Sequence, residues 1–212
     1  PYECNMTTLN ACMPPWYFNE GFEAITERLK SPEMRKKIKA EMESDKTPYD
    51  NYYLNAGGWS GVFVSSASKT PEAEGKFISK YAEEIGKDPW ETFFDILVAN
   101  HCVTGGVYSS MCEEDVCEII QDPYCIVGSD GLTRNWQEKG HPRAAGTFPH
   151  TITYFVQAKG ILTLEEAINR EKRANKIYFI QRHTGTIYQL CEIFNTKPHM
   201  VYDRVCSGWD IE

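Results

Sequence analysis

The sequence predicts a protein of the α/β class, because segments with strand character alternate with amphipathic helical segments along the chain. Three observations lead to this prediction. Apolar residues recur at helical spacing, short apolar runs are bounded by Gly or Pro, and the composition is globular. The chain has 212 residues, 42% hydrophobic and 25% charged. This length permits one sizeable core or two small ones without disulfides.

Two helices are expected between residues 22 and 42. The first has a stripe formed by Phe22, Ile25 and Leu29. Ser31 followed by Pro32 is typical of an N-cap with Pro at the first helical position, so a second helix should begin there. Its apolar positions are Met34, Ile38 and Met42.

The middle of the chain is expected to contain a loop, a strand and two more helices. Residues 47–60 are rich in Tyr, Asn and Gly and predict the loop, and residues 61–64 predict the strand. One helix should open at Thr70-Pro71, with Phe77, Tyr81 and Ile85 on one face and Gly86 as its stop, and the other at Asp88-Pro89.

The later part predicts further alternation. Residues 103–108 can form a strand, and residues 113–121 a helix with Val116, Ile119 and Ile120 inward. The apolar run 124–127 predicts a strand buried on both faces. Ile152, Phe155 and Val156 share one side of 147–158, a capping box at 163–166 opens another helix, and 177–191 has a hairpin pattern.

Composition and charge exclude several classes of protein. The net charge of −8 includes no dense basic cluster, so nucleic acid is not an expected partner. The longest apolar run, 93–99, is far below the roughly 20 residues that span a bilayer, and no secretory signal is recognised. We therefore expect a cytoplasmic protein whose eight cysteines are reduced thiols.

Two neighbouring segments could carry chemistry. Asp130 lies in the sequence Gly-Ser-Asp-Gly directly after the expected buried strand, at the sheet edge where α/β folds place their sites. His141 and Arg143 follow, and could relay protons and pair with a substrate carboxylate. From spacing alone, Asp130 is more simply explained by a tight turn after a strand. A solvated loop is as good an explanation of His141 and Arg143 as a functional site. The histidines have no metal-ligand spacing.

Three blocks of the sequence together resemble one enzyme family. They are Pro1-Tyr2 with Pro14-Pro15-Trp16, then 111–116 (MCEEDV), then Gly-Ser-Asp-Gly at 128–131 followed by 141–149 (HPRAAGTFP) and 160–168 (GILTLEEAI). This order is similar to that of the N-acyl-D-amino-acid deacylases (D-aminoacylases) of the amidohydrolase superfamily. The likeness covers residues 1–168 and resembles the C-terminal part of the family's chain.

The resemblance implies a zinc-dependent (β/α)8 TIM barrel that hydrolyses the amide of N-acyl-D-amino acids with a metal-activated water. Asp130 matches the family's catalytic Asp at the end of the last barrel strand, which implies a general base and a weak or second-site metal ligand. Arg143, His141, Met111 and Tyr2 match positions that imply substrate binding.

The resemblance also implies that something is missing from this chain. The main zinc ligands belong to the family's earlier half, so this chain by itself should bind no catalytic zinc and be inactive. We expect residues 1–168 to be the later part of the barrel, with an insertion at about 17–110, and 169–212 to be a divergent tail related to the small β domain. An N-terminal half or a second copy would then be its macromolecular partner.

Two alternatives stay open beside this interpretation. One is an amidohydrolase that acts on a cyclic amide such as a hydantoin, against which the Gly-Thr-Phe-Pro sequence argues. The other is a catalytically inactive fragment or interaction module, which should expose apolar surface.

Overall fold

The computed structural model describes residues 1–46, 48–131 and 140–171. The chain divides into two compact units. The first, called here the sheet unit, comprises Tyr2–Glu113 with residues 140–142, and the second, the helical unit, comprises Glu114–Gly131 with residues 143–171 and Pro1. The hairpin pattern at 177–191 and nearly all of the expected tail lie outside the described residues.

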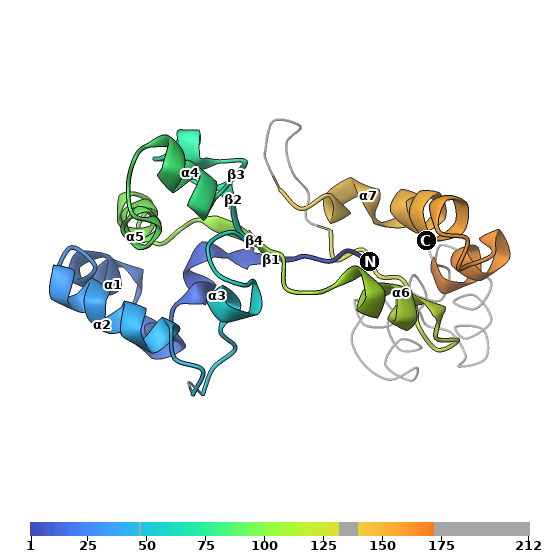
Figure 1. Cartoon of the computed structure of the whole chain (residues 1–212), viewed down its shortest axis with the longest axis horizontal. Coiled ribbons are helices and arrows are strands. Elements are labelled where there is room, and N and C mark those ends of the chain that lie inside the picture. The colour runs from blue at the N-terminus through green and yellow to red at the C-terminus, as the bar shows by residue number, and fades with distance from the viewer. Residues whose placement is uncertain (47, 132–139, 172–212) are drawn as a thin grey trace, which may run out of the picture. The chain divides into compact units, whose positions relative to one another are not determined.

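The sheet unit is built on a four-stranded sheet with the strand order β1-β4-β2-β3 (Figure 1). Its strands are β1 (Asn5–Thr8), β2 (Val62–Ser66), β3 (Lys76–Phe77) and β4 (Gly105–Tyr108). All three pairings are antiparallel, with a bulge in β2 between Val64 and Ser66. The strands expected near 61–64 and 103–108 are confirmed, whereas β1 and β3 were not expected. The described part of the chain contains no parallel strand pair.

Helices and short 3-10 turns surround this sheet. The α-helices are α1 (Phe22–Arg28), α2 (Pro32–Met42), α3 (Tyr52–Asn55), α4 (Ile78–Glu84) and α5 (Pro89–Ala99), and the 3-10 turns are η1 (Leu9–Cys12), η2 (Pro15–Phe18) and η3 (Pro71–Ala73). The expected N-caps are confirmed: Ser31 Oγ accepts from the Met34 amide at 3.4 Å, and Asp88 Oδ1 accepts from the Trp90 amide at 2.9 Å.

Two expectations for this unit are wrong. Thr70-Pro71 opens only the turn η3, and Phe77 belongs to β3, where it pairs with Phe63 of β2 and the two rings lie 5.5 Å apart. Phe77, whose helical spacing predicted a helix, thus lies in the edge strand β3, and α4 begins only at Ile78. Within the expected loop 47–60, Asn51 accepts a hydrogen bond from the Leu54 amide and starts the short helix α3.

The core of the sheet unit is rich in aromatic rings. Phe93 of α5 is fully buried, and its ring lies 4.5 Å from that of Trp59. Trp59 also contacts Tyr53 and Trp90, at 4.7 and 4.8 Å between ring centres. The expected inward positions Ile25, Leu29, Ile38 and Met42 are fully buried, whereas Phe22, which was expected on the same stripe as Ile25, is 47% exposed. The stripe of α1 is thus confirmed only in part.

The helical unit begins with α6 (Glu113–Gln121), whose bounds are those expected from the sequence. Ile120 is buried as expected, but Ile119 is 63% exposed. The expected strand at 124–127 is wrong, because Tyr124 is 89% exposed and the segment leaves the helix in a turn. The Arg170 guanidinium donates to the carbonyls of Gln121 and Cys125, so this backbone wraps around an arginine instead of pairing in a sheet.

The remainder of the helical unit is also helical. Helix α7 (Arg143–His150) continues into the π-helical segment η4 (Thr151–Ala158), and a last helix covers 164–171. The capping box is confirmed: Glu166 Oε2 accepts from the Thr163 amide at 2.7 Å, and Thr163 Oγ1 accepts from the Glu166 amide at 3.2 Å. Among the described residues, no helix is both long and apolar enough to cross a bilayer.

Candidate active site

Asp130 lies in an exposed turn of the helical unit. Its backbone is left-handed, with φ at 42°, a conformation that Asp tolerates better than most residues. The Asp130 carboxylate pairs with the Arg143 guanidinium, with 2.8 Å between Oδ2 and Nη2. The Asp130 side chain is 79% exposed and that of Arg143 is 18% exposed. The carboxylate is therefore open to solvent, while most of the arginine side chain is buried.

The start of α7 holds the turn that carries Asp130. The Thr147 hydroxyl lies 3.3 Å from the carbonyl oxygen of Ser129 and 3.2 Å from that of Arg143, so it can donate to either. Gly131 approaches α7 so closely that a Cβ there would lie 3.1 Å from the carbonyl oxygens of Arg143 and Ala144. This close approach explains the glycine after Asp130 and fixes the turn relative to Arg143.

The Asp130–Arg143 pair combines two chemical capacities. An exposed carboxylate can accept a proton from a bound water. The partly buried Arg143 guanidinium can bind a second carboxylate through two parallel hydrogen bonds. Because solvent screens so exposed a pair, it contributes little to stability. A substrate carboxylate could therefore replace Asp130 on Arg143 at small cost.

Three further residues assigned from the sequence lie in the sheet unit. His141 is 3% exposed, and its Nε2 lies 2.8 Å from the Cys4 carbonyl oxygen. The Tyr2 ring packs edge-on against the imidazole, with 4.9 Å between centres. Met111 is 46% exposed and its amide donates to the Glu3 carbonyl at 3.1 Å. The segments carrying Tyr2, Met111 and His141 thus come together in one region, called here the His141 cluster.

Sequence reasoning missed Cys4 in the His141 cluster. Its Sγ lies 3.2 Å from His141 Nε2. No local signal in the sequence could have found it, because Cys4 and His141 are 137 positions apart. Burial and the nearby Cys4 thiol raise the pKa of Tyr2 above its usual value.

The described residues do not fit a complete metal site. No group of three or more His, Cys, Asp or Glu side chains that could hold a metal occurs in the part of the chain that the structure describes. The Arg143 guanidinium against the Asp130 carboxylate also disfavours a cation at that oxygen. Asp130 could contribute one ligand to a metal, but the other ligands would have to come from elsewhere.

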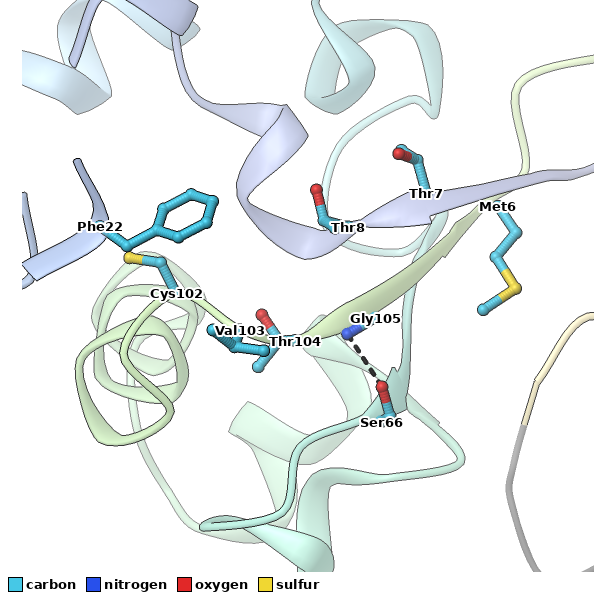
Figure 2. A pocket seen from close by; sticks show the side chains of 9 residues that line it. All are labelled: Met6, Thr7, Thr8, Phe22, Ser66, Cys102, Val103, Thr104 and Gly105. Carbon is cyan, nitrogen blue, oxygen red and sulfur yellow. Dashed lines mark hydrogen bonds between the residues drawn. The ribbon is translucent and has the colours of Figure 1, made fainter. Parts of the chain in front are cut away.

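A separate pocket lies in the sheet unit beside the ends of β1 and β4 (Figure 2). It has a volume of about 490 Å³ and is bordered by the exposed side chains of Phe22 and Val103, with the Thr8 hydroxyl near its rim. The Ser66 hydroxyl accepts from the Gly105 amide at 3.1 Å. Burial raises the pKa of the Cys102 thiol, so this lining residue is a poor nucleophile. None of the catalytic or substrate-binding residues expected from the sequence lines this pocket.

In a comparison with known proteins, this chain is similar to deacylases of N-acyl-D-amino acids. No family model matches. The particular relatives, all from Alcaligenes xylosoxydans xylosoxydans, include a D-aminoacylase, 33% identical over 98 residues, and an N-acyl-D-aspartate deacylase, 34% identical over 111. These matches cover 46% and 52% of this chain but 19% and 21% of the relatives. The chain spans about a fifth of the length of these curated relatives, and the resemblance is confirmed as a partial match.

Solved structures give a weaker likeness. An N-acyl-D-glutamate deacylase from Bordetella bronchiseptica, complexed with zinc and a phosphonate inhibitor, is 23% identical with a TM-score of 0.48. A D-aminoacylase studied for its binuclear metal centre is 24% identical with a TM-score of 0.47. Each alignment covers 79% of this chain and 34% of the other.

Proposed function

We propose that this chain supplies the general base and a substrate-binding arginine for the hydrolysis of N-acyl-D-amino acids. The observation that carries the proposal is the match, at about a third identity, to three deacylases of N-acyl-D-amino acids. The exposed Asp130 carboxylate on the Arg143 guanidinium supports it chemically, because the two groups can serve the water and the substrate carboxylate respectively.

In the proposed reaction Arg143 binds the α-carboxylate of the substrate. This new pairing releases the Asp130 carboxylate, which removes a proton from the attacking water as the new carbon–oxygen bond forms. Asp130 then passes this proton to the amine nitrogen as the carbon–nitrogen bond breaks, giving a carboxylic acid and a free D-amino acid. His141, Met111 and Tyr2 are proposed to bind substrate as well.

The proposal includes a metal that the described residues cannot hold alone. A zinc ion would polarise the amide carbonyl and acidify the water, with Asp130 as a weak or second-site ligand. We further propose that residues 1–168 are the later part of a (β/α)8 barrel with an insertion at about 17–110, that 169–212 are a divergent tail, and that the chain alone is inactive. The remaining ligands would come from an N-terminal half.

The first experiment is to determine the intact mass and zinc content of the protein as isolated from its source, and its activity on N-acetyl-D-methionine. We expect zinc, hydrolysis of the D form and no hydrolysis of the L form. Faster turnover of a hydantoin would favour a cyclic-amide hydrolase. A native mass of 24.3 kDa, without metal or activity, would show that the protein occurs without an N-terminal half, and would favour the non-catalytic function described below.

The test with variants compares the same substitution at two aspartates, Asp130 and Asp45. We expect Asp130→Asn to reduce turnover by several orders of magnitude while the fold and zinc content stay unchanged. Asp45→Asn, which makes the same chemical change at an exposed site in the other unit, should retain normal turnover. Near-normal activity of Asp130→Asn would remove this residue from the reaction.

A second candidate function is that of a non-catalytic interaction module. Exposed apolar side chains of the helical unit favour it, since Tyr124 is 89%, Ile119 63% and Leu164 51% exposed. Such a chain should dimerise or bind a partner half. A stable monomer by light scattering at high concentration would count against this function.

A further inference from the structure

We propose that Cys4 is a modification site, a thiol activated by His141 that reacts with small electrophiles and hydroperoxides. This inference concerns the His141 cluster and does not depend on the deacylase activity. It rests on the geometry around the sulfur, the exposure of Cys4 and the contrasting surroundings of other described cysteines.

The geometry determines which atom carries the proton. His141 Nε2 lies 2.8 Å from the Cys4 carbonyl oxygen, and a carbonyl oxygen can only accept, so Nε2 must be the donor. The Cys4 sulfur lies 3.2 Å from the same nitrogen. The sulfur is therefore close enough to share this N–H as a second acceptor. A thiol sulfur is a weak acceptor, whereas a thiolate is a strong one, so the contact favours the thiolate, which is the nucleophilic form.

The imidazole is held where it can act on the sulfur. His141 is 3% exposed, its N–H is oriented by the Cys4 carbonyl, and the Tyr2 ring packs edge-on against it. Tyr2 and His141 are titratable groups that lie beside Cys4 in the described part of the chain, and Glu3 precedes it in the chain. Cys4 itself is half-buried, in contrast to the fully buried Cys12.

Other described cysteines have surroundings that suppress reactivity. Cys12 is completely buried, and burial raises the pKa of its thiol to about 12. Burial also raises the pKa of Cys102 and Cys125. Cys4 combines partial exposure with a donor nitrogen at its sulfur, and we therefore expect it to react before these three.

The oxidation step balances with the hydroperoxide as oxidant. The Cys4 thiolate attacks the terminal oxygen, an S–O bond forms and the O–O bond breaks, and the leaving alkoxide takes a proton from water to give an alcohol. The sulfur loses two electrons, which the peroxide gains, and Cys4 becomes a sulfenic acid. With iodoacetamide the sulfur instead forms an S–C bond and iodide leaves.

The test measures alkylation of the full chain with limiting iodoacetamide between pH 5.5 and 9. Trypsin releases Cys4 and Cys12 in one peptide, because the first basic residue is Arg28, and fragmentation separates the two positions. An ordinary thiol, with a midpoint of about 8.5, is only about 1% thiolate at pH 6.5. We expect native Cys4 to react at pH 6.5 at least tenfold faster than Cys4 in the guanidinium-unfolded chain, and Cys12 to react only after unfolding.

Variants separate the effect of His141 from that of exposure. His141→Phe keeps a ring beside Tyr2 but removes the donor, and should slow Cys4 labelling at pH 6.5 at least fivefold. His101→Asn, at an exposed histidine whose left-handed backbone Asn tolerates, should leave the rate unchanged. Equal rates in wild type and His141→Phe would overturn the proposal.

The proposal remains testable if His141→Phe does not fold. The wild-type comparison then decides it: a native rate at pH 6.5 equal to or below the unfolded rate overturns the proposal, and a tenfold higher rate supports it. Treatment with tert-butyl hydroperoxide and dimedone should mark Cys4 before Cys12. Failure of the deacylase assay would leave these outcomes unchanged, so the two proposals fail separately.

Discussion

Replacing Arg35 with Met should destabilise the sheet unit through the loss of one buried guanidinium. The Arg35 side chain is 13% exposed, and its Nε donates to the Leu29 carbonyl at 2.7 Å, at the end of α1. The same group pairs with Asp95 at 2.8 Å and with Glu91, both on α5. Arg35 therefore ties the end of α1 to α2 and α5, while Met preserves its apolar stem.

The magnitude follows from these contacts. A hydrogen bond from a charged group contributes about 1.5–3 kcal/mol, and its loss leaves the Leu29 carbonyl at a helix end without this partner. The Glu91 and Asp95 side chains are 46% and 40% exposed, so solvent screening limits each ion pair to about 0.2–1 kcal/mol. The expected loss is about 2–5 kcal/mol.

The assay is urea unfolding followed by tryptophan fluorescence. Trp136 and Trp209 are replaced by Phe, so that the three remaining tryptophans, Trp16, Trp59 and Trp90, all report on the sheet unit. Lys80→Met is the control, because the Lys80–Glu83 pair is highly exposed and its loss should leave the midpoint within error. If Arg35→Met shifts the midpoint no more than Lys80→Met, the reasoning about the buried guanidinium is refuted.

Three further outcomes are expected. Burial raises the pKa of Asp95, but hydrogen bonds from Lys87 and Arg35 lower it by more, so the net pKa lies below 3.8. Urea titrations should therefore find Asp95→Asn destabilising near neutral pH, with a difference that disappears as the pH falls below about 3.8. A difference that does not depend on pH would contradict this. Gly131→Ala should cost about 1 kcal/mol in thermal unfolding by crowding α7, whereas Gly128→Ala, whose Cβ meets nothing within 4 Å, should cost nothing. Thr163→Ala should cost about 1 kcal/mol and speed amide exchange in the helix over 164–171, and unchanged exchange would show that the cap is unimportant.

Short-range chemistry explains the features that could be predicted. Ser31 and Asp88 cap helices through bonds to amides two or three residues ahead, and the Thr163–Glu166 box closes within four residues. The stripe of α2 likewise follows from spacing. Asp130 and Arg143 were found through a family resemblance, and their ion pair joins residues only 13 positions apart.

Long-range partners decided the features that could not be predicted. Phe77 has a helical spacing to Tyr81 and Ile85, yet pairing with Phe63 across the sheet edge places it in β3. The apolar run at 124–127 looks like a buried strand, but carbonyls of this segment bind Arg170, 45 residues after Cys125. Neither partner is visible in a local window.

The sequence by itself determined the α/β class, most helix boundaries and the caps, because these depend on neighbours along the chain. The positions that match deacylases came from a resemblance to a family. Only the tertiary structure decided that the sheet is antiparallel with β1 at its edge, and that Cys4 meets His141 across 137 positions. A thiol becomes a candidate nucleophile only when folding brings a donor nitrogen to its sulfur, and no local pattern encodes that contact.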